Sequence, residues 1–201
     1  MEKVACKECG AMILPATAER TGGRCMPCKN GIRKSIEAGI AWREKDRELD
    51  RTCPFRALWR SLHERIHSRG GGLDSLSLVE RRYWVLNVFE GEIFNGGFDQ
   101  YFHNSSGSQF NETVDALKEI DATDALSLLQ TAKQLIFSDR NVPKDTGERR
   151  QLMLSLWPGS TPGLDALDRK YWELPSRIGE TLERYAVAQG LVSVAGTLCF
   201  G

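Results

Sequence analysis

The apolar positions between residues 54 and 190 recur at helical spacing, and this pattern predicts most of the fold. Pro54 suits the first turn of a helix, and apolar side chains follow at positions i, i+3, i+4, i+7 and i+11: Phe55, Leu58, Trp59, Leu62 and Ile66. This spacing places them on one face of an amphipathic helix. Related patterns recur at 112–120, 124–136, 147–157, 164–172 and 175–186. Because no strand alternation of any length appears outside residues 1–30, we expect a mainly α, multi-helix globular bundle.

The longest apolar pattern begins at a strong helix-start signal. Ser77 followed three residues later by Glu80 is the pattern of a capping box, so we expect a helix to begin at about Leu78. Residues 79–93 are apolar on most sides of this helix. The pattern therefore predicts the central and most buried helix of the domain.

This helix runs into a glycine-rich corner at residues 89–107. Asn95-Gly96-Gly97 interrupts the aromatic pattern, which resumes at residues 98–102 and stops at Asn104-Ser105-Ser106-Gly107. Each glycine costs helix stability unless a positive φ or a close approach requires it. We therefore expect a sharp corner that is a deliberate feature of the fold.

The polar residues of the corner allow three interpretations. In the first, the asparagines and serines cap helices and the glycines permit close packing. In the second, a polar pocket for a ligand or partner peptide is lined by Glu92, Asn95, Gln100 and Asn104. In the third, the corner is a hydrolase site with an Asp99–His103–serine relay, and with Glu90 and Glu92 as rival acid–base groups. Neither an exposed nucleophile nor an oxyanion hole is signalled by the sequence.

Four of the six cysteines have the spacing of a metal site. They follow the pattern C-x2-C-x15-C-x2-C at Cys6, Cys9, Cys25 and Cys28. Four thiolates surround Zn²⁺ tetrahedrally and leave no open position for substrate, so we expect a structural zinc ion. Iron, a redox dithiol and plain free thiols are the alternatives. A segment this short cannot bury a core, so metal binding would supply its folding energy.

The segment after the cysteines is rich in charge. We expect a zinc-ribbon-like module at 1–30, a charged helical connector at 31–53 and an α-helical domain at 54–201. Acidic and basic residues alternate in the connector, which favours an exposed, salt-bridged helix. Contact with nucleic-acid phosphates is an alternative role for the basic side chains Lys29, at the end of the cysteine module, and Arg33, Lys34 and Arg43 of the connector.

His63 and His67 lie four residues apart on the polar side of the helix that follows Pro54. Such a pair could bind a metal ion. No nearby cysteine or well-placed carboxylate completes a tetrahedral site, which favours a solvated flank.

Charge is unevenly distributed, although the net charge is zero. Residues 1–70 carry 15 basic and 9 acidic side chains, whereas residues 71–201 carry 12 and 18. This asymmetry indicates two surfaces with different partners, or ordinary variation between helical surfaces. The acidic excess is concentrated at 112–124, where one helical face carries Glu112, Asp115 and Glu119.

No apolar stretch reaches the roughly 20 residues of a membrane span. The start of the chain also lacks the apolar core of a signal peptide. We therefore expect a cytoplasmic protein. The apolar tail at 191–201 has no clear pattern and is not assigned to an element.

The run from Glu92 to Gly107 resembles the hallmark of a bacterial family, the all-helical DNA-mimic proteins. Arg149-Arg150 and the segment Leu164-Asp165-Ala166-Leu167-Asp168 fit the layout of that family. The resemblance covers about residues 54–180 and leaves out the cysteine module. It implies an all-helical fold, a homodimer, and binding to DNA-binding proteins by imitation of DNA charge.

Together these observations favour a non-enzymatic protein-binding module with structural zinc. Its partner would be a DNA-binding or a toxin-like protein, with Glu112, Asp115 and Glu119 as candidate contact residues. The alternatives are a nucleic-acid-binding protein that uses the zinc module and connector, and a hydrolase at the Asn95-Gly96-Gly97 corner.

Overall fold

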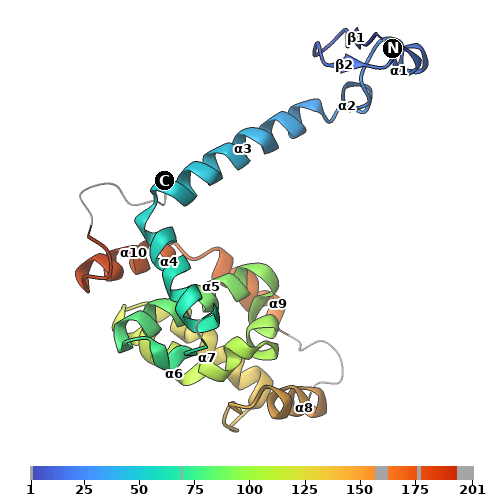
Figure 1. Cartoon of the computed structure of the whole chain (residues 1–201). Helices are drawn as coiled ribbons and strands as arrows, with labels where there is room; N and C mark the ends of the chain where they lie inside the picture. The colour runs from blue at the N-terminus through green and yellow to red at the C-terminus, as the bar shows by residue number, and fades with distance from the viewer. Residues whose placement is uncertain (1, 69, 157–162, 176–177, 194–201) are drawn as a thin grey trace. The chain divides into compact units, whose positions relative to one another are not determined.

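The structure, a computed structural model, describes residues 2–68, 70–156, 163–175 and 178–193. It divides into two compact units, Met1–Thr52 and Cys53–Gly201, which are described separately (Figure 1). Most of the apolar tail, from residue 194 onward, lies outside the described residues. None of the helices in the described part of the chain is long and apolar enough to cross a membrane.

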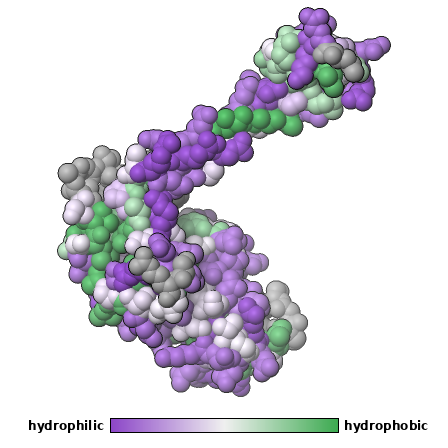
Figure 2. Space-filling view, in the orientation of Figure 1, coloured by the Kyte–Doolittle hydropathy of each residue, from purple (hydrophilic) through white to green (hydrophobic). Residues whose placement is uncertain are grey.

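The first unit begins with a small hairpin. Strand β1 (Val4–Ala5) pairs antiparallel with β2 (Met12–Ile13), with Val4 opposite Ile13. Three helices follow, α1 (Pro15–Thr21), α2 (Met26–Lys29) and α3 (Arg33–Thr52). No residue of α3 is buried. Figure 2 shows hydrophobic side chains along the amino-terminal half of α3 and hydrophilic ones along its carboxyl-terminal half.

The second unit is mainly helical, as the apolar spacing predicted. It begins with α4 (Pro54–His63), which continues into a π-helical turn (Glu64–Ser68), and a 3₁₀ turn (Leu73–Ser75) follows. The remaining elements are α5 (Leu78–His103), a 3₁₀ turn (Ser105–Gln109), α6 (Phe110–Glu119), α7 (Thr123–Phe137), α8 (Thr146–Leu156), α9 (Leu164–Trp172) and α10 (Ile178–Ala188).

Helix α5 is the centre of this unit, as predicted. The Ser77 hydroxyl accepts a hydrogen bond from the Glu80 amide at 3.4 Å, and the Glu80 carboxylate accepts one from the Ser77 amide at 2.7 Å. This is the predicted capping box. Helices α4, α6, α8, α9 and α10 all contact α5 (Figure 1). The core around it is aromatic: the Phe89 ring meets those of Tyr101 and Tyr171 edge-on, at 5.1 and 5.7 Å.

The predicted corner is a kink within α5. Gly97 has φ +75°, and both Gly96 and Gly97 leave helical geometry before the helix resumes at Phe98. The buried Asp168 carboxylate of α9 accepts a hydrogen bond from the Phe98 amide at 2.9 Å. It therefore acts as an N-cap for the second half of α5. A Cβ atom on Gly97 would overlap this carboxylate, so glycine is required here for both φ and space.

A buried arginine holds the other end of the kinked segment. Arg149 of α8 is completely buried and donates from Nε to the Phe102 carbonyl at 2.6 Å. Its Nη2 donates to the Asn104 carbonyl at 2.5 Å, and its Nη1 to the Pro143 carbonyl at 2.8 Å. Burial lowers the pKa of Arg149. Carbonyls at the carboxyl end of a helix carry partial negative charge, which suits a guanidinium.

Candidate functional site

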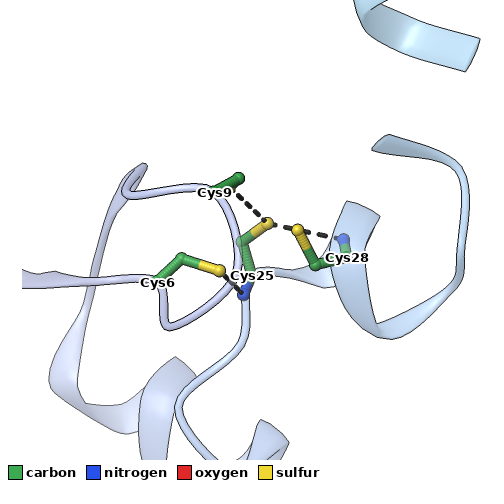
Figure 3. A group of neighbouring side chains, drawn as sticks. All are labelled: Cys6, Cys9, Cys25 and Cys28. Atoms are coloured by element: carbon green, nitrogen blue, oxygen red, sulfur yellow. Dashed lines mark hydrogen bonds between the residues drawn. The ribbon is translucent and has the colours of Figure 1, made fainter. Parts of the chain in front are cut away.

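The four cysteines come together from two local structures, the β1–β2 hairpin and the start of α2 (Figure 3). Gly10, with φ +72°, closes the hairpin turn by donating its amide to the Cys6 carbonyl at 2.9 Å. Cys25 lies at the N-cap of α2, and Cys28 lies within its single turn. The four sulfur atoms all lie within 4.8 Å of one another. The predicted spacing therefore does produce one cluster.

The size of the cluster fits a tetrahedral metal ion. The sulfur atoms of Cys9 and Cys25 are 3.6 Å apart. A tetrahedron with metal–sulfur bonds of about 2.3 Å has sulfur–sulfur edges of about 3.8 Å. Cys6, Cys25 and Cys28 are buried, and the four thiols supply a complete tetrahedral set of protein ligands. This arrangement is typical of structural rather than catalytic metal sites.

Hydrogen bonds and burial act in opposite directions on the thiols. The Cys25 amide donates to the Cys6 sulfur at 3.1 Å and lowers the pKa of Cys6 to about 6. Arg33 donates to the Cys25 sulfur at 3.0 Å and lowers the pKa of Cys25. Burial raises the pKa of Cys28 to about 12. A bound cation would offset this burial penalty, because it stabilises every thiolate around it.

The α5 corner forms a second polar cluster, centred on Glu92. Its carboxylate accepts hydrogen bonds from Gln100 Nε2 at 2.6 Å, Asn104 Nδ2 at 2.9 Å and Ser106 Oγ at 2.9 Å. Three of the four predicted pocket residues thus lie together, and Asn95 is exposed on the helix. Ser106 was absent from the predicted set. Because Glu92 precedes the kink and its three partners follow it, these hydrogen bonds tie the two halves of α5 together.

The structure does not bring together the side chains of the hypothetical Asp99–His103–serine relay. Asp99 and His103 are both exposed, and no hydrogen bond joins their side chains in the described part of the chain. The Ser106 hydroxyl donates to Glu92 instead of to an imidazole. The rival group Glu90 accepts a hydrogen bond from the Gly179 amide at 3.3 Å, near the start of α10.

The acidic face of α6 is partly balanced by the start of α5. Glu112 forms an ion pair with Arg81, and Glu119 forms one with Arg82. The Glu119 carboxylate also accepts a hydrogen bond from the Tyr185 hydroxyl at 2.9 Å. Asp115 lies 3.7 Å from Lys118, and both side chains are mostly exposed. The arginines precede their partners by more than 30 residues, so no local charge pattern predicted these pairs.

The turn between α6 and α7 carries further acidic groups. Asp121, with φ +55°, and Asp124 are exposed and line a hollow of about 290 Å³. Thr181 and Arg184 of α10 line the same hollow. Neither aspartate forms an ion pair with another described residue. Glu112, Asp115 and Glu119 each have a basic partner, so the excess negative charge of this surface lies around Asp121 and Asp124.

The four basic candidates of the first unit differ in their surroundings. Lys29, Lys34 and Arg43 are exposed. Arg33 is turned toward the cysteine cluster and is hydrogen-bonded to Cys25. Three of the four side chains are thus accessible to a partner from solvent.

The chain thus combines a cysteine module of the metal-binding type with a mainly helical domain that is built around a kinked central helix. The sequence model of the family described as "DMP19-like protein" matches residues 74–189, which is more than half of the chain. The chain therefore belongs to the DMP19-like family, of the DNA-mimic type. The match covers α5 to α10 and leaves out the cysteines. No curated protein and no solved structure matches the chain.

Proposed function

We propose that the helical unit binds a protein partner whose own ligand is DNA. Membership of the DMP19-like family is the observation that carries this proposal. It is supported by the acidic surface that runs along α6 into the turn before α7. The proposed contact residues are Glu112, Asp115, Glu119, Asp121 and Asp124.

The spacing of these carboxylates suits a short stretch of phosphates. Glu112 and Glu119 are separated by about 10 Å along a helix that rises about 1.5 Å per residue. B-DNA carries about one charge per 1.7 Å of axis, so this surface would imitate only a few phosphates. Ion pairs with Arg81 and Arg82 hold two of the carboxylates in place. The turn aspartates Asp121 and Asp124 would supply the net negative charge that attracts a basic surface, and Asp115 is paired only with the exposed Lys118.

We propose that the four cysteines hold one structural Zn²⁺ ion. All four ligands would come from the protein, so the ion would have no position for a substrate. The ion would order the hairpin and α2, which share only a small buried cluster.

The Glu92 cluster, with Gln100, Asn104 and the nearby Asn95, is proposed as a further contact surface for the protein partner.

Nucleic-acid binding through the first unit is a second candidate function. It is favoured by the absence of buried residues in α3, where Lys34 and Arg43 are exposed to solvent. Each phosphate that these groups neutralise releases counterions. This candidate therefore predicts binding to duplex or single-stranded DNA that weakens steeply with salt.

The test is a pull-down from nuclease-treated lysate of the native host, washed at low and then moderate salt. We expect recovery of a basic DNA-binding protein that moderate salt releases, because exposed charges are screened. A variant with Asp115→Asn, Asp121→Asn and Asp124→Asn should lose it. A control that removes three exposed charges elsewhere, Asp99→Asn, Asp165→Asn and Glu173→Gln, should retain it. Equal recovery by both variants would contradict the proposed surface, and capture of nucleic acid alone would favour the second candidate.

A further inference from the structure

A pair of histidines outside the sites described above has the spacing of a metal ligand pair. The sequence His63-Glu64-Arg65-Ile66-His67 has the form H-E-x-x-H, which places two imidazoles on one helical face. His63 ends α4, and His67 lies in the π-helical turn that follows. Turns of this kind are rare and occur frequently at functional sites. Both histidines are exposed.

The two rings are already close to each other and share a rigid support. Their centroids are 4.4 Å apart, with an interplanar angle of 46°. Both rings lie about equally far from the Trp84 ring of α5, at 5.9 and 6.0 Å. Trp84 is itself buried and stacks on Trp59 at 4.1 Å. Ligands held in place in this way lose little conformational freedom when they bind an ion.

The ring nitrogens of this pair are available. Neither His63 nor His67 forms a hydrogen bond within the part of the chain that the structure describes. Neutral imidazole is the commonest protein ligand of transition metals. A bound nitrogen lies about 2.0–2.1 Å from the metal, which puts each ring centroid about 3 Å from it. Two rings at neighbouring coordination positions then have centroids about 4–5 Å apart, and the observed separation falls in this range.

We propose that His63 and His67 form a two-imidazole site for a divalent transition-metal ion of the Ni²⁺, Cu²⁺ or Zn²⁺ class, whose remaining positions are filled by water. Imidazole suits these ions, whereas Mg²⁺ and Ca²⁺ prefer oxygen ligands. The site is separate from the cysteine cluster and does not depend on the proposed partner binding.

The same motif serves as the zinc site of metallopeptidases, but this site lacks their third protein ligand. Among the described residues, the cysteine cluster is the only group of three or more histidine, cysteine or carboxylate side chains close enough to hold one ion. A catalytic zinc ion ordinarily has three protein ligands. We therefore infer a binding site with open, water-filled positions, and we assign it no hydrolytic activity.

The test is a titration of Ni²⁺ into the untagged full chain, loaded beforehand with zinc and dialysed. The imidazole NMR signals of its three histidines report the site directly, because a nearby paramagnetic ion broadens them. We expect the signals of His63 and His67 to broaden together. His67→Ala should weaken Ni²⁺ binding at His63 by about 100-fold, because the second ligand acts at high effective concentration. The matched control His103→Ala should leave the affinity unchanged.

Two results would overturn the proposal. The first is broadening of His63 at the same Ni²⁺ concentration in His67→Ala as in the wild type, which would indicate isolated imidazoles. The second is broadening of the His103 signal at the same Ni²⁺ concentration that broadens the signals of His63 and His67. The reciprocal variant His63→Ala, followed at His67, gives an independent reading, and circular dichroism verifies that each variant keeps its helices. Nickel bound at the cysteines would not produce the paired signal, because no histidine belongs to that cluster.

Discussion

In residues 1–30 the buried apolar cluster consists of cysteines, with Ile13 packed against it, whereas the helical unit buries a continuous set of aromatic and aliphatic side chains. Phe89, Phe98 and Phe102 of α5 are fully buried, and every later helix contributes to the same core. A module without such a core needs another source of folding energy. The difference indicates that a metal ion would supply the folding energy of the first region, whereas apolar burial supplies that of the second.

The two regions also differ in how they use buried charge. In the first, thiols gather around a position for a cation. In the second, Arg149 and Asp168 are buried at the two ends of the kinked segment and are paired with backbone groups. Each fits against a glycine: Gly97 lies beside Asp168, and Gly107 beside Arg149. Three of the four predictions from this contrast compare a residue with a near neighbour, and the fourth compares Asp168 with asparagine at the same position.

The largest expected effect is in the cysteine module. Cys25→Ser should lower the metal content from about one ion per chain to none and should unfold residues 1–30. Structural zinc contributes apparent binding energies of about 10–16 kcal/mol in small domains. Elemental analysis and amide NMR signals of residues 1–30 are the measurements. The exposed Lys29, next to Cys28, provides the control: Lys29→Ala should retain both metal and signals. A metal-free variant with an ordered module would contradict the account.

The next largest effect is at the buried arginine. Arg149→Met should destabilise the helical unit by about 4 kcal/mol, because the buried Phe102 carbonyl and the partly buried Asn104 and Pro143 carbonyls lose a donor at about 1–3 kcal/mol each. Its neighbour Arg150 is exposed and donates one hydrogen bond, to the His103 carbonyl at 2.8 Å. Arg150→Met should cost less than about 1 kcal/mol. Urea unfolding followed by circular dichroism measures both, and equal losses would show that the arginine does not hold the corner.

Two glycines of α5 separate the kink from ordinary helix. Gly97→Ala should cost about 3 kcal/mol, because alanine is strained at positive φ and its Cβ would meet the Asp168 carboxylate. Gly91 lies on the same helix, and a Cβ there meets nothing within 4 Å. Gly91→Ala should instead stabilise the protein by up to about 1 kcal/mol. Thermal unfolding of both variants is the measurement, and a neutral Gly97→Ala would refute the proposed constraint.

The smallest expected effect concerns the pH dependence of Asp168. Burial raises the pKa of this carboxyl above its ordinary value of 3.8, and the Phe98 amide opposes the shift. The folded state therefore binds the proton more tightly than the unfolded state. The stability of the wild type relative to Asp168→Asn should rise as pH falls from 7 toward 4. Urea unfolding across this range measures the difference, and a decrease would mean that the amide hydrogen bond outweighs burial.

Features with a local cause were predictable from the sequence. The capping box at Ser77 and Glu80 forms as expected, because both partners lie within one helical turn. The break at Gly96-Gly97 and the meeting of the four cysteines also follow from short-range patterns. Family membership was predictable for the same reason, because residues 92–107 form one continuous motif.

Features that depend on distant residues were not predictable. Asp168 caps a helix 70 positions earlier in the chain, and Arg149 binds carbonyls 45 and 47 positions earlier. Their sequence neighbourhoods look like ordinary charged helix surface. The pairing of Glu112 and Glu119 with arginines of α5 was missed for the same reason. Only tertiary packing determines which charged side chains of a helix are buried.

The contrast between the two regions is tested most directly by hydrogen exchange of the full chain with and without a strong metal chelator. We expect the chelator to abolish amide protection in residues 1–30 and to leave the protection of α5 and α7 unchanged, because only the first region would depend on an ion. Unchanged protection of residues 1–30 after confirmed removal of all metal would contradict it. So would loss of protection in α5 at the same chelator concentration.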